Sequence, residues 1–223
     1  MRVPNLIHHV FARGVNKQQI FFAEEDYRFF LWVTKQALQE NSVRCLAYCL
    51  MPNHYHLLIQ HRDPVVPLLM KKINETYARY INKKHERVGH LFQGRYGDVI
   101  VEPGGHALQL CRYIELNPVR ANLCSDPGSY LWSSARAKLG RAPAPSFLDV
   151  FESYRLLGLS EALPLNEKRR AYARYLSRLD QARRYKQILA SSIRHGFILG
   201  SDDFVEKVLQ ATEHPYSFLG SRF

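Results

Sequence analysis

The sequence has no long apolar run. Its hydrophobic stretches fall short of the roughly 20 residues that a membrane-spanning helix needs. The first residues, Met1 to His9, lack the apolar segment of a secretory signal. We therefore expect a cytoplasmic protein with no membrane partner. Internal repeats and low-complexity segments are also missing from the sequence, which argues against repeat architectures.

Cysteine pairs with metal-binding spacing are absent as well. The four cysteines, at positions 45, 49, 111 and 124, form no CxxC pair. This spacing indicates neither a zinc ribbon nor a disulfide framework. We expect reduced thiols in the core, where cysteine is commonly buried.

Acidic side chains are scarce relative to basic ones. There are 20 Asp and Glu against 31 Lys and Arg, which gives a formal charge of +11. Residues 1–145 carry 19 basic and 11 acidic side chains, and residues 146–223 carry 12 and 9. Such an excess predicts a polyanionic partner, and nucleic acid is favoured over a membrane surface. A hydrophobic content of 46% is enough for a packed core.

The periodicity of apolar residues predicts a mixed α/β arrangement in the first part of the chain. Strands are expected at 6–13, 43–50, 54–60 and 94–102, and helices at 26–39, 68–84 and 107–116. This order, β-α-β-β-α-β-α, is typical of the split βαβ unit. We predict the α+β class, with a ferredoxin-like antiparallel sheet that has its helices on one face. The other sheet face would then be free for a partner.

A composition change divides the chain near residue 140. We predict a first domain over 1–140, a Pro- and Ala-containing linker over 141–146, and a helical, basic C-terminal extension over 147–223. The extension contains a basic amphipathic helix over 165–189 and a helix over 202–210 that begins after Ser201. The basic helix either follows phosphates or is the solvated face of a helical bundle. We also expect a chain that ends near Gly140 to fold.

Two histidines stand two residues apart in the strand predicted at 54–60. Because side chains alternate along a strand, His54 and His56 project from the same sheet face. Two such imidazoles can chelate a metal ion. An isolated His-x-His pair recurs by chance in structural roles, so its context decides. Here the pair opens an apolar strand in a basic protein.

That context resembles a known family. The segment Met51-Pro52-Asn53-His54-Tyr55-His56-Leu57-Leu58-Ile59 is similar to the HUH motif of single-tyrosine transposases, particularly the REP-associated tyrosine transposases of bacteria. Three further segments, 89–96, 113–121 and 130–134, resemble family segments in the same order. The resemblance spans residues 5–140, and several ordered motifs are more specific than the histidine pair alone.

The resemblance implies an HUH endonuclease core and assigns roles to four side chains. In that family two histidines and a polar residue on a later helix hold a divalent cation, Mg²⁺ or Mn²⁺. A tyrosine one helical turn earlier attacks a DNA phosphate. His54, His56, Asn117 and Tyr113 match those places, and positions i and i+4 share a helix face. The wider family commonly has Gln where Asn117 stands, and Pro118 disturbs the helix there.

Other residues remain candidates for the same functions. Tyr96, in the strand predicted at 94–102, is the main alternative nucleophile, whereas Tyr77 and Tyr80 fit an apolar helix stripe typical of a core. Four arginines are candidates to hold the DNA backbone, although each also fits a solvated surface: Arg13, Arg95, Arg112 and Arg120.

The resemblance favours an enzyme. Its predicted activity is metal-dependent cleavage and strand transfer on single-stranded or hairpin DNA at repeated sequences, through a covalent 5′-phosphotyrosine and with no small-molecule substrate. The alternative is a domesticated protein that binds single-stranded DNA or RNA without catalysis. A barrel metal hydrolase is excluded, because 223 residues leave little room for that barrel and no ordered set of further Asp and His ligands is present.

Overall fold

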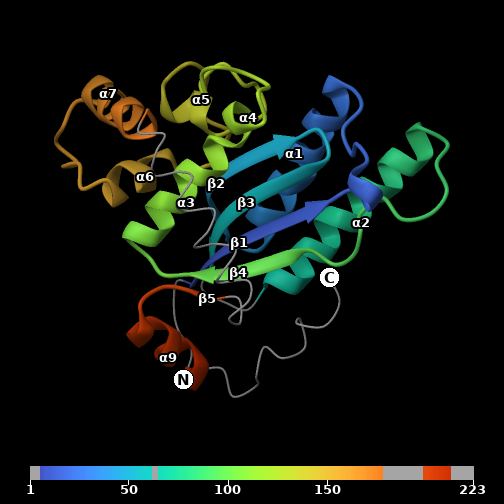
Figure 1. The fold of residues 1–223 in the computed structure, drawn as a ribbon, viewed down its shortest axis with the longest axis horizontal. Coiled ribbons are helices and arrows are strands. Elements are labelled where there is room, and N and C mark those ends of the chain that lie inside the picture. The colour runs from blue at the N-terminus through green and yellow to red at the C-terminus, as the bar shows by residue number, and fades with distance from the viewer. Residues whose placement is uncertain (1–5, 62–64, 178–197, 212–223) are drawn as a thin grey trace.

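The computed structural model describes residues 6–61, 65–177 and 198–211 (Figure 1). The strands in these ranges are β1 (Leu6–Arg13), β2 (Arg44–Met51), β3 (His54–His61), β4 (Gly97–Val101) and β5 (Ile198–Leu199). The helices there are η1 (Val15–Lys17), α1 (Glu24–Glu40), α2 (Val66–Lys84), α3 (Gly105–Glu115), α4 (Asn117–Arg120), α5 (Ala135–Lys138), α6 (Val150–Leu156), α7 (Leu165–Leu176) and α9 (Asp202–Ala211). Among these helices, none is both long enough and apolar enough to cross a membrane.

The strands form one sheet in the order β2-β3-β1-β4-β5. Neighbouring strands are antiparallel except for β5, which pairs in parallel with β4. The central position of β1 and β3 is that of the split βαβ, ferredoxin-like fold. The predicted fold class is therefore confirmed. Each strand and helix predicted in residues 6–116 is present, with ends shifted by a few residues.

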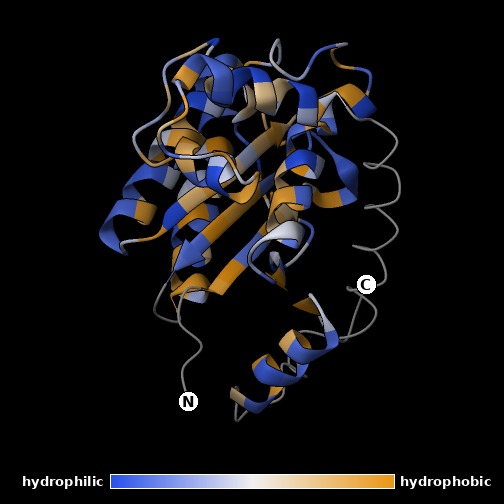
Figure 2. Cartoon of the chain, turned by 90° about the vertical axis from the view of Figure 1, so that its left-hand side faces the viewer, coloured by the Kyte–Doolittle hydropathy of each residue, from blue (hydrophilic) through white to orange (hydrophobic). Residues whose placement is uncertain are grey.

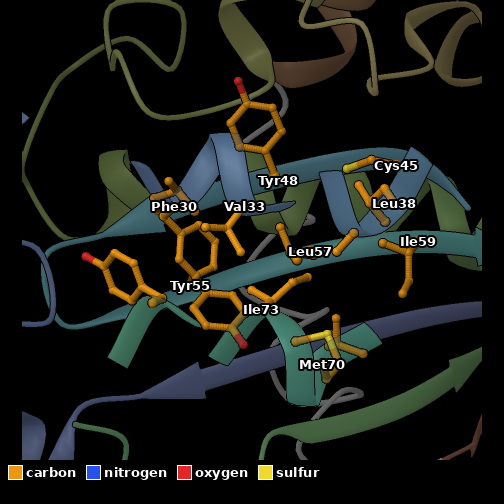
Figure 3. Packing of buried hydrophobic residues seen from close by; sticks show 14 of the residues in the cluster. Phe30, Val33, Leu38, Cys45, Tyr48, Tyr55, Leu57, Ile59, Met70 and Ile73 are labelled. Atoms are coloured by element: carbon orange, nitrogen blue, oxygen red, sulfur yellow. The ribbon is translucent and has the colours of Figure 1, made fainter. Parts of the chain in front are cut away.

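Helices α1 and α2 cover one face of the sheet. Phe30 and Val33 of α1 and Ile73 of α2 meet Tyr55 and Leu57 of β3 in the buried core (Figure 3). Figure 2 shows strands that are mostly hydrophobic and helices that mix both kinds of residue. Such mixed helices bury one apolar stripe and leave the rest to water. The stripes of α1 and α2 thus fix both helices on this face.

Helix α3 lies on the opposite face, mainly over β2. Its Leu110, Cys111 and Ile114 pack in one buried cluster with Ala47 of β2 and Leu58 of β3. The expectation that helices cover one face only and leave the other free is therefore wrong. The physical reason is that α3 has an apolar stripe of its own, which must be buried against a second apolar surface. Helix α3 consequently lies on the sheet face from which His54 and His56 project.

The chain after the predicted linker does not separate from the sheet. Phe147 and Leu148 belong to the same core cluster as Phe30. The Cys45 backbone N–H donates to the Phe147 carbonyl over 3.2 Å, and the Asp149 N–H donates to the Cys45 carbonyl over 2.8 Å. The expectation that the first 140 residues have a complete core of their own is wrong, because an apolar pair directly follows the linker. The boundaries themselves remain a prediction.

A buried ionic network connects α3 to the extension. The Glu115 carboxylate accepts hydrogen bonds from Ser134 Oγ over 2.6 Å and from Tyr172 OH over 2.7 Å. Lys138 Nζ forms an ion pair with it at 2.7 Å, and both side chains are fully buried. Residues from α3, α5 and α7 therefore share one carboxylate.

The extension agrees with part of the helical prediction. Helix α7 begins where the basic helix was predicted, at Leu165, and residues 178–189 of that prediction lie outside the described residues. Lys168 is buried and donates to the Glu161 carbonyl over 2.7 Å, so it does not face a phosphate. The helix predicted after Ser201 is confirmed as α9, and Ser201 is its N-cap, because Ser201 Oγ accepts from the Phe204 N–H over 3.3 Å.

The four cysteines are free thiols. Cys45, Cys49 and Cys111 are buried, which confirms the expected core role for these three. Cys124 is only partly buried. Burial raises the pKa of Cys45 to about 12, so this thiol is inert at neutral pH.

A buried carboxylate joins α1 to α2 on the first face. Asp26 accepts hydrogen bonds from the backbone N–H groups of Phe22 and Ala23 over 2.8 and 2.9 Å, and from Lys84 Nζ over 2.6 Å. Burial raises its pKa, but the hydrogen bonds from Lys84 and the two N–H groups outweigh burial and leave the pKa below its usual value. The native state thus holds the carboxylate in its charged form.

Asp26→Asn is expected to lower the unfolding free energy by about 1–3 kcal/mol at pH 7, because a charge-assisted network loses its acceptor. The pKa of Asp26 is lower in the native state than in the unfolded chain. Its contribution is therefore fully present above about pH 4 and is lost as the pH falls through the lower native value. Urea unfolding at a series of pH values should show the two proteins converge in acid. Glu40→Gln is the control, because the Glu40–Lys72 pair also joins α1 to α2 but lies in solvent.

Candidate functional site

The histidine pair lies at the start of β3, on the face that α3 covers. In the β1–β3 register His54 is opposite Arg13 and His56 is opposite Phe11. The His54 and His56 rings are perpendicular to each other, with centroids 5.1 Å apart. His56 is buried, and His54 is partly exposed at the edge of the pair. The prediction that both imidazoles share a face therefore agrees with the ring contact.

Helix α3 brings Tyr113 to this pair. The Tyr113 ring lies edge-on to His56, with centroids 6.0 Å apart and an interplanar angle of 80°. Tyr113 is half-buried against the cluster that contains Cys111 and Ile114. The unexpected position of α3 on this sheet face therefore places the Tyr113 phenol beside the His56 imidazole.

An arginine covers the phenol from the following short helix. The Arg120 guanidinium carbon lies 4.0 Å from the centre of the Tyr113 ring, and its Nη2 donates to the Tyr113 carbonyl over 2.5 Å. Burial raises the pKa of Tyr113, whereas the positive charges of Arg120 and Arg13 act in the opposite direction. Both arginines therefore favour negative charge on this oxygen.

Asn117 follows one turn after Tyr113, where α3 has ended and α4 begins. Its amide nitrogen donates to the carbonyls of Tyr113 and Ile114 over 3.1 and 3.3 Å. These two bonds satisfy carbonyls at the end of a helix that Pro118 prevents from continuing. The amide nitrogen is thus engaged with the end of α3, and Oδ1 is the atom that the predicted ligand role would use.

The two histidines are held in the form that binds metal ions. Burial and then the Arg13 charge lower the pKa of His54 to about 4. Burial, followed by neighbouring His9 and His54, holds the pKa of His56 well below its usual value. Neutral imidazole keeps a lone pair. Asn53 Oδ1 accepts from His54 Nδ1 over 2.6 Å, which leaves the lone pair on Nε2.

This donor set fits a divalent cation. Two imidazole nitrogens and one amide oxygen suit a first-row ion such as Mn²⁺, and oxygen donors also suit Mg²⁺. Within residues 6–61, 65–177 and 198–211 no group of three or more His, Cys, Asp or Glu side chains is arranged to hold a metal ion. The third ligand predicted at this site, Asn117, is a side chain of another kind.

Comparison with known proteins identifies the family. The model of the family described as "Transposase IS200 like" matches residues 2–117, which is just over half of the chain. The chain belongs to the IS200-like transposase family. No match exists among the curated proteins.

Solved structures show what this transposase resembles in fold. A REP-associated tyrosine transposase bound to a REP hairpin is 12% identical, with a TM-score of 0.55, and the match covers 67% of this chain and 88% of that chain. A crystal structure from Deinococcus radiodurans R1, described as a transposase, is 18% identical with a TM-score of 0.38 and covers 54% and 87%. The first of these matches shows that the two chains share a fold.

The four candidate DNA-binding arginines of this transposase differ in exposure and in their contacts. Arg13 is exposed opposite His54, and Arg95 is exposed in the loop before β4. Arg120 lies over the Tyr113 ring and donates to the Tyr113 carbonyl. Arg112 is only 1% exposed, and its guanidinium stacks on Tyr175 with the carbon 4.6 Å from the ring centre. The prediction that Arg112 holds the DNA backbone is wrong for this structure, because α7 covers it.

The alternative nucleophile lies on the other side of the sheet. Tyr96 packs against the core cluster formed with α1 and α2, which includes Tyr55. Because Tyr55 alternates with His54 and His56 along β3, it points away from the histidine face. Tyr113 is the candidate whose ring contact with His56 is described above. Tyr77 is fully buried in the same cluster as Tyr96, as its helix stripe predicted.

Sequence reasoning missed one residue at the site. His9 of β1 is fully buried, and its Nε2 lies 2.9 Å from His56 Nδ1. The period of two places His9 on the same face of β1 as Phe11 and Arg13. That signal was present, but only the register of β1 against β3 shows which residues of the two strands are neighbours.

Proposed function

We propose that this transposase cleaves and rejoins single-stranded DNA at hairpin-forming repeats, with Tyr113 as the nucleophile. The observation that carries the proposal is the contact between Tyr113 and His56, two residues from distant elements. A phenol beside two neutral imidazoles and two arginines has the components for attack on a phosphodiester. Membership in the IS200-like family supports this assignment.

The proposed step breaks one ester bond and forms another. Tyr113 Oη attacks the phosphorus and loses its proton to solvent, the bond between phosphorus and the 3′-oxygen breaks, and the 3′-oxygen takes up a proton from solvent. The products are a 5′-phosphotyrosine and a DNA end with a free 3′-hydroxyl. The bond energy is retained in the adduct, so attack by another 3′-hydroxyl rejoins strands without ATP. Arg120 and Arg13 favour the charged phenolate that attacks and that later leaves.

His54, His56 and Asn117 are the residues proposed to hold a divalent cation, Mg²⁺ or Mn²⁺. When bound, such an ion polarises a nonbridging phosphate oxygen and offsets the negative charge of the transition state. The protein's own contribution is to keep both imidazoles neutral and the Asn117 oxygen available. Imidazole ligands favour Mn²⁺, and abundance in cells favours Mg²⁺.

Charge and the fold relative support a DNA hairpin as substrate. The net charge of +11 suits a polyanion. The similar solved transposase is bound to a REP hairpin, and exposed Arg13 stands next to the histidine pair in the ladder. We therefore propose hairpin DNA with a single-stranded flank as the partner of this site.

His54→Ala is expected to abolish formation of the protein–DNA adduct while DNA affinity changes by no more than about three-fold. The reason is that the metal site loses a ligand, whereas the basic surface is unchanged. The measurement is a denaturing gel of the protein with a labelled hairpin oligonucleotide and Mn²⁺, together with a binding titration.

His106→Ala is the matched control, because this histidine lies at the other end of α3 and faces Glu102. It should leave the adduct at its full level. Full adduct formation by His54→Ala would reject the metal site. DNA binding by the unaltered protein with no adduct under any divalent ion would instead support the non-catalytic binding function.

A further inference from the structure

His9 of β1 and His56 of β3 form a buried imidazole pair next to the proposed metal site. His9 Nε2 and His56 Nδ1 are 2.9 Å apart, and the two rings stack with centroids 5.0 Å apart and an interplanar angle of 26°. His9 is fully buried and His56 is 7% exposed. The nitrogen of His56 that takes part in this contact is therefore not the one available to a metal ion.

A hydrogen bond between two imidazole nitrogens needs one proton, and the side that supplies it sets the chemistry of His56. If His56 Nδ1–H donates to His9, the Nε2 of His56 keeps its lone pair. If His9 Nε2–H donates instead, a neutral His56 carries its proton on Nε2 and cannot bind a metal ion there. His9 Nε2, at 2.9 Å from His56 Nδ1, is within reach to accept the Nδ1 proton of His56.

We propose that His9 is a positioning residue for the metal ligand His56: its Nε2 accepts the Nδ1–H of His56 and holds that ring in the tautomer and orientation that present Nε2. This inference rests on the proposed function, because it presupposes the metal site. It adds a residue that touches neither metal nor DNA. Partners of this kind fix the ring of many metal-bound histidines.

The neighbouring histidine shows that the His9 arrangement differs from an ordinary buried pair. His8, the residue before it, points to the opposite face, where its Nδ1 lies 2.7 Å from the Asp98 carboxylate. His9 has an imidazole as its partner in place of a carboxylate. In the described residues each of the two rings keeps one buried nitrogen without a hydrogen-bond partner, His8 Nε2 and His9 Nδ1. What distinguishes His9 from His8 is therefore its contact with a residue of the proposed metal site.

His9 is also distinct from a third ligand. Its Nε2 is directed at His56 Nδ1, and the described residues offer no cluster of three His, Cys, Asp or Glu side chains for a metal ion. The contact therefore supports a positioning role for His9 toward His56.

The test compares three variants of the full chain: His9→Phe, which removes the acceptor and keeps a ring, His9→Gln, which keeps an acceptor near the Nε2 position, and His8→Gln as the control on the other face. Mn²⁺ affinity is measured by electron paramagnetic resonance without DNA. Nitrogen NMR of histidine-labelled protein reports the tautomer of His56. We expect His9→Phe to weaken Mn²⁺ binding by about 10- to 100-fold. His9→Gln should restore most of it, and His8→Gln should leave it within about two-fold.

The outcomes separate this inference from the proposed function. If the unaltered protein binds no Mn²⁺, the metal site itself is rejected. If it binds Mn²⁺ and His9→Phe binds equally well, the positioning role of His9 is overturned. If His9→Phe does not fold, the NMR spectrum of the unaltered protein tests the proposal through the tautomer of His56. A proton on His56 Nε2 would overturn the role, and a proton on Nδ1 would support it.

Discussion

Tyr113→Phe is expected to abolish the covalent protein–DNA adduct and to reduce strand cleavage by about 10⁴-fold or more, because removal of the nucleophile in covalent enzymes has effects of this size. The substitution removes one oxygen and leaves the ring against His56 and Arg120. We therefore expect the thermal unfolding midpoint and the affinity for a hairpin oligonucleotide to stay close to those of the unaltered protein. The adduct is measured on a denaturing gel and the rate by product formation.

Tyr96→Phe is the matched control, because it removes the same atom from the tyrosine on the opposite sheet face. Its adduct should form at the normal rate. An adduct that persists in Tyr113→Phe and maps by mass spectrometry to Tyr96 would transfer the role. That result would also mean that the α3 contact with His56 has no catalytic meaning.

A chain that ends at Gly140 is expected to remain unfolded. This is the reverse of what composition indicates, and two observations require it. The shortened chain loses Phe147 and Leu148 from the core, and it loses Tyr172, one of the partners of the buried Glu115. Circular dichroism and a urea titration should show no cooperative transition. A folded fragment that still forms the adduct would establish 1–140 as an independent domain.

Glu115→Gln tests the same network within the full chain. Loss of the carboxylate leaves the buried Lys138 ammonium without its counter-ion, so we expect the unfolding free energy to fall by about 3–5 kcal/mol. Tyr172→Phe removes one hydrogen bond from the network, with an expected loss of about 1–3 kcal/mol. Tyr175→Phe is the control on the same helix, because its hydroxyl donates to the Leu108 carbonyl at a half-buried position. It should cost less than Tyr172→Phe in the same titration.

The sequence was sufficient for the four strands before residue 102 and for their order along the chain, because alternation and turn residues are local properties, but it did not predict β5. It also gave Tyr113, Asn117 and the histidine pair as candidates, through the resemblance of ordered motifs to a family, and their roles stay a prediction. It did not predict where α3 packs. The apolar stripe of α3 says that the helix is buried, but the choice of sheet face depends on which surface is left uncovered by α1 and α2.

Two further errors have a common origin in long-range contacts. Arg112 has the same charge as the exposed Arg95, and only the packing of Tyr175 from α7 shows that it is buried. The sequence gives no partner for His9, and the strand register places it against His56. A single sequence carries no signal for either contact, because each joins elements whose relative position is decided by the whole fold.

The hydrogen bonds along the outer side of β2 also bear on aggregation. β2 is the last strand of the sheet, and such strands tend to pair with the same strand of another molecule. Here Trp132 accepts from the Leu50 N–H, Ser134 donates to the Tyr48 carbonyl, and residues 147–149 pair with Cys45. Other segments of the same chain therefore cover the outer edge of β2. In a chain that ends at Gly140, the Cys45 part of this edge loses its cover, so inclusion bodies with intermolecular β-structure are the form in which such a chain should accumulate.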